Sequence, residues 1–153
     1  MALTLLAGCV SSGKSGAISA LPDSVRANAR IASVELQNTP RTGVSATFNS
    51  DFERFVQTKV DGCTTGQSAL TLQVTLDGYH APNFAHALFA PSESQISGVA
   101  RLVDSSGAVV GEYRIQRSLI IGGVLGAVAA ANAERTMSEA FGDELCKQAF
   151  RRR

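Results

Sequence analysis

The chain contains no tryptophan, and aromatic residues make up only 6% of its 153 residues. This scarcity argues against a surface that stacks sugars or nucleic-acid bases, because such surfaces are built from aromatic rings. The net charge is only +1, so the overall charge gives no reason to expect nucleic acid or anionic lipid as a partner. The longest apolar run, residues 119–133, is too short to cross a bilayer.

The first half of the chain shows three regular patterns of apolar residues. Apolar side chains recur at every second position over residues 30–38, which predicts a strand. Over residues 44–63 they recur at helical spacing instead, and they form one apolar stripe on the predicted helix. The clearest strand covers residues 68–78, where leucine and valine alternate with polar residues.

The second half predicts a hairpin and a closing helix. Residues 95–117 form two apolar strands around a turn at residues 104–107. A glycine-rich link then leads to a helix that carries Met137, Phe141 and Leu145 on one stripe. We therefore predict a single α+β domain over residues 30–153. It is a two-layer sandwich in which helices cover one face of a mainly antiparallel sheet, in the order strand, helix, three-strand meander, helix.

The three cysteines are informative through their positions. Cys9 follows an apolar run, whereas Cys63 and Cys146 lie near the ends of the two predicted helices. If Cys9 carries lipid, the other two form an even pair, and a disulfide is reasonable in an oxidising compartment. In the cytosol, all three would be unrelated free thiols. Their spacing fits no zinc site, and we expect no metal.

The first fifteen residues support two different interpretations. Gly8, four further residues and then Gly13, Lys14 and Ser15 match the phosphate-binding pattern G-x-x-x-x-G-K-[ST]. That pattern has meaning only between a buried strand and a helix. Only six residues separate Ser15 from the helix-breaking Pro22. A nucleotide-binding protein that uses Gly8–Ser15 is therefore the alternative, not the preferred interpretation.

The same stretch contains Leu6-Ala7-Gly8-Cys9, which resembles the lipobox of bacterial lipoproteins. This resemblance implies that residues 1–8 are the remnant of a lipoprotein signal peptide and that Cys9 is acylated. Residues 9–29 are rich in serine, glycine and alanine, so we expect a flexible tether behind the lipid. Val10, which takes the place of an aspartate after the cysteine, implies the outer membrane.

From residue 29 to residue 150, the layout resembles that of small outer-membrane lipoproteins of unknown function. It is also similar to the lipopolysaccharide-assembly and curli-secretion lipoproteins. The matching stretches are residues 70–74, residues 102–104 with Gly107, and the pair Gly122-Gly123. This resemblance implies a periplasmic protein with a partner in the envelope. It implies no catalysis, and no cofactor other than the lipid on Cys9.

Two segments are candidates for contact with other molecules. A long connection after residue 78 contains apolar and aromatic residues that either fold back on the core or bind a partner, namely Tyr79, His80, Phe84, His86, Leu88 and Phe89. We expect the two histidines to be exposed to solvent and not to bind metal. The second segment, 122–131, is either a packed helix start or a surface that faces an oligomer or a membrane; its leading residues are Gly122, Gly123, Val124, Leu125 and Gly126.

These features together predict a membrane-anchored, non-catalytic accessory subunit of an envelope protein complex. We expect an envelope or outer-membrane protein as its partner and no nucleic acid. A further alternative is a ring- or pore-forming subunit that oligomerises through Gly122–Ala131.

Overall fold

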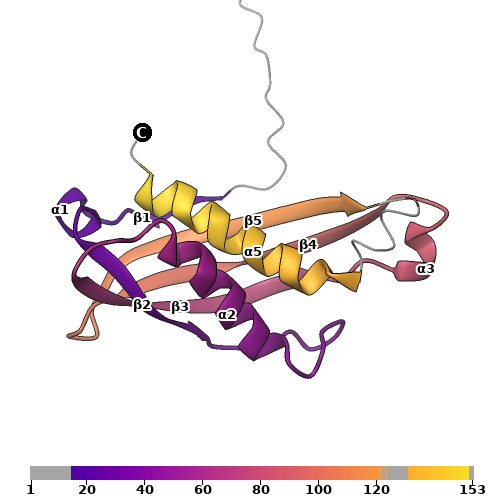
Figure 1. The fold of residues 1–153 in the computed structure, drawn as a ribbon, viewed down its shortest axis with the longest axis horizontal. Helices are drawn as coiled ribbons and strands as arrows, with labels where there is room; N and C mark the ends of the chain where they lie inside the picture. Colours follow the sequence, from indigo (N-terminus) through magenta and orange to yellow (C-terminus); the bar gives the residue numbers. More distant parts are fainter. Residues whose placement is uncertain (1–14, 122, 124–130, 152–153) are drawn as a thin grey trace, which may run out of the picture.

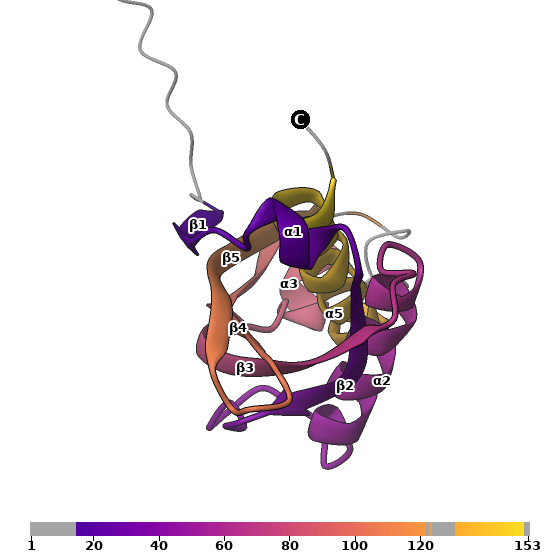
Figure 2. The same ribbon diagram turned by 90° about the vertical axis from the view of Figure 1, so that its left-hand side faces the viewer.

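The computed structural model describes residues 15–121, 123 and 131–151. Its elements form two layers, with the long helices lying on one face of a five-stranded sheet (Figures 1 and 2). In chain order they are β1 (Gly16–Ser19), α1 (Asp23–Arg26), β2 (Ala29–Leu36), α2 (Phe48–Asp61), β3 (Ser68–His80), α3 (Phe84–Ala87), β4 (Ser92–Val103), β5 (Val109–Ile121), α5 (Ala133–Leu145) and the π-helical turn η1 (Cys146–Phe150).

The sheet has the strand order β1-β5-β4-β3-β2. Strands β3, β4 and β5 form the expected antiparallel meander, and β1 pairs antiparallel with β5. Among the described strands, only β2 and β3 pair in parallel, because α2 connects them and returns the chain to the same end of the sheet. The predicted α+β two-layer sandwich with a mainly antiparallel sheet is confirmed.

The core lies between the sheet and the pair α2 and α5. Helix α2 buries the stripe that its spacing predicts, and the ring of Phe52 on α2 packs edge-on against Phe141 of α5 at 5.5 Å. Residues on the inner face of the sheet, such as Leu72, Ile96 and Ile115, are fully buried against them. Among the described helices, none combines the length and apolar character needed to cross a membrane.

The structure differs from the expected tether over residues 9–29. Residues from Gly16 onward belong to the folded domain, because β1 pairs with β5 and Leu21 is only 1% exposed. The Leu21 backbone N–H also donates to the Tyr113 hydroxyl at 2.7 Å. A four-residue strand with a bulge has no regular alternation of apolar and polar residues, so no periodic pattern predicts it. Cys9 and the rest of residues 1–14 lie outside the described residues.

The structure contradicts the nucleotide-binding alternative. Ser15 is followed by the strand β1, whereas a phosphate loop must open a helix at that point. The Ser15 side chain is bound to the sheet: its Oγ donates to the Gln116 carbonyl at 3.0 Å and accepts from the Gln116 N–H at 2.9 Å. The remaining motif residues, Gly8, Gly13 and Lys14, lie outside the described residues.

Candidate interaction surface

The connection between β3 and β4 is more ordered than the expected long loop. Strand β3 continues to His80, and the short helix α3 occupies Phe84–Ala87. Asn83 caps this helix, since its side-chain oxygen accepts a hydrogen bond from the His86 backbone N–H at 3.0 Å. The connection is thereby fixed at one end of the sheet.

Tyr79 folds back on the core, which is the first of the two arrangements that the sequence left open for this connection. Its ring packs edge-on against Phe48, with the ring centroids 5.3 Å apart. Burial, together with the nearby Glu134 carboxylate, raises the pKa of Tyr79 to about 12. Its hydroxyl forms no hydrogen bond with any described residue. The inward direction follows from its position opposite the buried Ile96 on β4.

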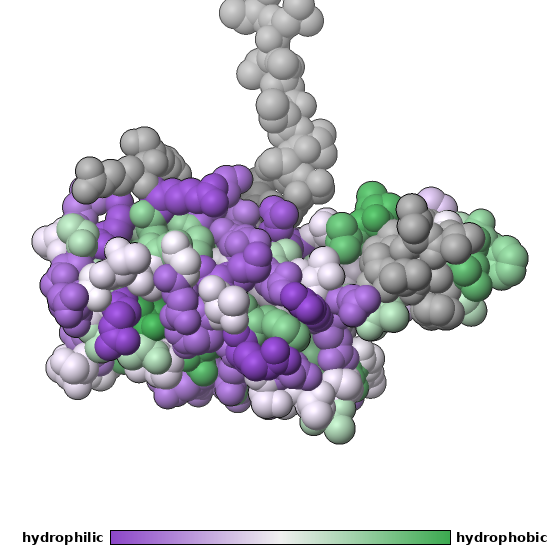
Figure 3. Space-filling model, in the orientation of Figure 1, coloured by the Kyte–Doolittle hydropathy of each residue, from purple (hydrophilic) through white to green (hydrophobic). Residues whose placement is uncertain are grey.

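Three exposed apolar side chains lie at the end of the molecule where the β3–β4 connection meets the end of β5. Leu88 is 42% exposed, Phe89 is 89% exposed and Ile120 is 75% exposed. Ile120 of β5 lies opposite Glu93 of β4. Glu93 follows Phe89 by four residues in the chain. We call these three residues the apolar tip, and Figure 3 shows apolar side chains concentrated at this end of the molecule. Exposed apolar residues that cluster in this way mark interaction sites.

Sequence reasoning identified Leu88 and Phe89 but missed Ile120. The available signal was the outward side of β5, where Arg114, Gln116 and Ser118 precede it at every second position. An isoleucine that continues a polar row faces solvent and not the core. The exposure of Ile120 therefore follows from its place in this alternation and not from its own hydropathy.

The other candidate residues have separate positions. His80 and His86 are exposed, and no cluster of metal-ligating side chains occurs in the described part of the chain. Phe84 begins α3, and its side chain is not described. Gly123 has a positive φ of 75°. The other four candidates of the oligomer segment lie outside the described residues, namely Gly122, Val124, Leu125 and Gly126.

Ion pairs lie across the central strands on the open face of the sheet. Arg101 pairs with Glu112 across β4 and β5 at 2.8 Å, and Arg114 of β5 pairs with Asp77 of β3 at 2.7 Å. These exposed pairs keep the face hydrated and add little stability. The apolar tip therefore contrasts with the sheet surface beside it.

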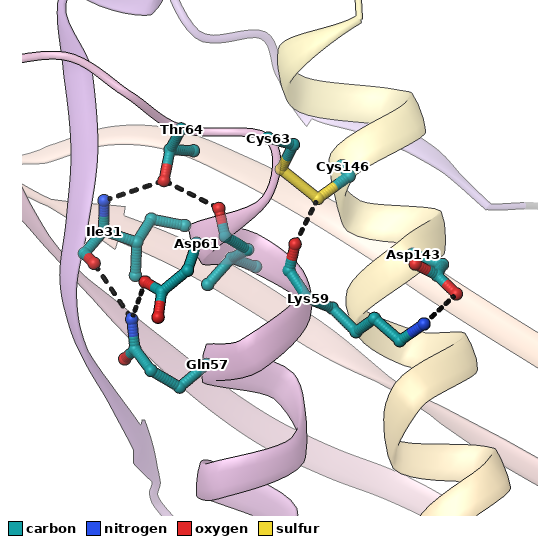
Figure 4. Close-up of a disulfide and its surroundings, with 9 residues drawn as sticks. Ile31, Gln57, Lys59, Asp61, Cys63, Thr64, Asp143 and Cys146 are labelled. Atoms are coloured by element: carbon teal, nitrogen blue, oxygen red, sulfur yellow. Dashed lines mark hydrogen bonds and ion pairs between the residues drawn. A yellow bond between two sulfur atoms is a disulfide. The ribbon is translucent and has the colours of Figure 1, made fainter.

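Cys63 and Cys146, whose pairing the sequence left open, are joined by a disulfide in the structure. The bond links the end of the α2 region to η1, and the Cys146 sulfur lies 3.5 Å from the Lys59 carbonyl oxygen (Figure 4). An ion pair between Lys59 and Asp143 at 3.2 Å joins the same two helices one turn away. This cross-link fixes the helical layer that covers the sheet.

Comparisons with known proteins show similarity of fold. No family model matches the chain, and no curated protein matches it. A PelC subunit, solved as a dodecamer from Paraburkholderia phytofirmans, is 11% identical; the match covers 92% of this chain and 100% of that chain, with a TM-score of 0.56. The two chains share a fold, and the low identity extends the conclusion no further.

Two other solved structures match more weakly. A protein from Xanthomonas campestris is 14% identical over 78% of this chain and 77% of that chain, with a TM-score of 0.44. A minor lipoprotein from Acinetobacter baumannii is 12% identical over 74% of this chain and 82% of that chain, with a TM-score of 0.32. These two similarities are too remote to support an argument about function.

Proposed function

We propose that the chain is a lipid-anchored, non-catalytic accessory subunit of an envelope protein complex, and that it works as a ring of its own copies. The observation that carries this proposal is the apolar tip, whose Phe89 and Ile120 side chains are exposed at 89% and 75%. Such side chains are stabilised by burial, at roughly 25 cal/mol per Å² of apolar area removed from water. A second copy of the chain is the occupant we propose.

The fold supports this choice of occupant. A subunit with the same fold, PelC, has been solved as a dodecamer. When one surface of a subunit contacts a different surface of the next, repetition closes a ring if the rotation permits. The tip would supply the apolar centre of such a contact, and the polar sheet beside it would supply the rim.

The proposed anchor places the domain close to a membrane. Ser15, the first described residue, stands six positions after Cys9, and a fully extended chain of that length spans about 20 Å. An acylated Cys9 would therefore hold the domain near the bilayer and raise its effective concentration for neighbouring copies. The disulfide is in accord with the oxidising compartment in which outer-membrane lipoproteins fold.

Light scattering coupled to size-exclusion chromatography tests the ring. In a Cys9→Ser background, which removes the lipid, we expect the molar mass of the parent chain in solution to be a multiple of 16.0 kDa. Phe89→Ser with Ile120→Ser should reduce it to a monomer, because the apolar centre of the contact is lost. The matched control is Ile18→Ser with Val109→Ser, which removes two other exposed apolar side chains and should leave the assembly intact. A monomeric parent, or equal behaviour of the two double variants, contradicts the proposal.

The anchor requires its own measurement, the intact mass of the protein extracted by detergent from native membranes. We expect a chain that begins at Cys9 and carries added acyl mass, and we expect Cys9→Ala to lose that mass. A chain that retains Met1 without added mass contradicts the anchor but leaves the ring untouched.

A further inference from the structure

A second surface feature lies between β1, α1 and η1, and Tyr113 of β5 also lines it. Strand β1, helix α1 and the turn η1 surround an open groove of about 980 Å³. This volume is at the upper end of the range for sites that hold small molecules. Its wall combines apolar atoms of Phe150 with polar and charged side chains from both ends of the described chain.

The charge of the groove is positive. Three cationic side chains, Arg26, Lys147 and Arg151, and one carboxylate, Asp23, line it, which leaves a net charge of +2. The Arg26 guanidinium is held in place, because it donates to Asp23 at 2.7 Å and to the Leu21 carbonyl at 2.9 Å. Lys147 and Arg151 are exposed, and their side chains form no ion pair with any described residue. Asp23 is thus paired with Arg26 at the surface, and the cations of Lys147 and Arg151 remain available to a ligand.

The groove also lies where the two ends of the described chain meet. Ser15 and Gly16 line it at the start of β1, and Phe150 and Arg151 line it at the end of η1. In Figure 2, α1 and β1 lie beside the last turn of the C-terminal helix. If Cys9 is acylated as proposed above, the groove is within about 20 Å of the lipid and can reach the bilayer surface.

We propose that this groove binds a phosphomonoester, carried either by a lipid headgroup or by a small soluble molecule. A phosphomonoester bears a charge of about −1.5 to −2 near neutral pH, which matches the net charge of the lining. The forked guanidinium of Arg151 suits two phosphate oxygens at once, and the Lys147 ammonium adds a mobile point charge. The apolar atoms of Phe150 would contact the organic part of the ligand.

Vesicle co-sedimentation and calorimetry test this site with the full chain in the Cys9→Ser background. The probes are phosphatidylcholine vesicles with and without phosphatidate, and glycerol 3-phosphate in solution. We expect Lys147→Gln with Arg151→Gln to weaken binding about 30-fold, since each cation near an anionic surface contributes about fivefold. The reciprocal exchange, Lys147→Arg with Arg151→Lys, keeps the charge and should keep most of the binding.

The control is Arg30→Gln with Arg41→Gln, which removes the same charge from two exposed arginines outside the groove. Loss in the groove variant alone, on phosphatidate vesicles, supports a lipid headgroup as the source. Binding of glycerol 3-phosphate with the same dependence supports a soluble ester. Equal loss in both charge-removal variants, or binding of neither probe, overturns the proposal. Because the Cys9→Ser chain carries no acyl group, the result is independent of the proposed anchor. Thermal unfolding verifies that each variant is folded.

Discussion

The side chain of Asp104 stabilises the hairpin turn between β4 and β5. One carboxylate oxygen accepts hydrogen bonds from the Ser106 hydroxyl at 2.6 Å, the Ser106 N–H at 2.9 Å and the Ala108 N–H at 3.0 Å. These donors, the Ser106 hydroxyl foremost, hold the pKa of Asp104 below its usual value of 3.8. Gly107 completes the turn with a φ of 85°, where a side chain would be strained.

We predict that Asp104→Ala lowers the melting temperature at neutral pH and that the difference from the parent shrinks in acid. A carboxyl whose pKa is lowered by folding stabilises the protein above its unfolded-state pKa. That contribution is lost as the pH falls through the folded-state pKa. Melting curves from pH 7 to pH 2 measure the effect. Asp104→Asn is the control, since its amide oxygen can still accept the turn hydrogen bonds; a difference that does not change with pH contradicts the assignment.

At the scale of elements, α2 and α5 lie in close contact at Gly142. A Cβ atom there would lie 2.8 Å from the Lys59 Cβ and 3.4 Å from the Val56 Cα. Real carbon atoms do not approach to the first of these distances, and the Lys59 Cβ cannot move without its backbone. The two helices are held there by the Cys63–Cys146 disulfide, so they cannot separate freely.

Gly142→Ala should therefore destabilise the protein by about 1–3 kcal/mol, the usual cost of overpacking. Helix propensity alone would predict the opposite change, because alanine is more favourable than glycine in a helix by about 1 kcal/mol. Denaturant unfolding measures the change in free energy. Gly16→Ala is the matched control, since nothing lies within 4 Å of the added methyl group. A stabilised Gly142→Ala variant would show that the helices are not in contact at this position.

The elements that could be predicted from the sequence are those with sustained periodicity. The stripe of Phe52, Val56 and Val60 identified α2, and the alternation of Leu72 and Val74 identified β3. Strand β1 could not be found, because its stability comes from β5, nearly a hundred residues later, and from the burial of Leu21. Pairing between distant segments leaves no local signal.

The candidate site followed the same rule. Phe89 was identified because it stands in an apolar cluster outside any predicted strand. Tyr79 belongs to the same cluster, but a register shift in β3 turns it toward the core, and only the paired strands reveal that shift. The groove between β1, α1 and η1 joins residues from both ends of the chain and was not visible in the sequence.

At the scale of the whole molecule, the disulfide closes a covalent loop between residues 83 positions apart. Cross-links of this span stabilise a folded domain by limiting the freedom of its unfolded chain, typically by about 2–5 kcal/mol. In the Cys9→Ser background, Cys63→Ser with Cys146→Ser should lower the free energy of unfolding by that amount. A reductant should bring the parent chain to the level of this variant and leave the variant unchanged. A parent chain that is insensitive to reductant contradicts the prediction.

The position of this covalent loop also determines how the molecule responds to a mechanical load. Strands β3, β4 and β5, the three at the centre of the sheet, lie between Cys63 and Cys146, whereas β1, β2 and α2 precede the loop. A pull on the N-terminal end can draw out the chain only as far as Cys63. The closed loop withholds roughly 290 Å of further contour length, at about 3.5 Å per residue. Reduction of one bond would release that length at once.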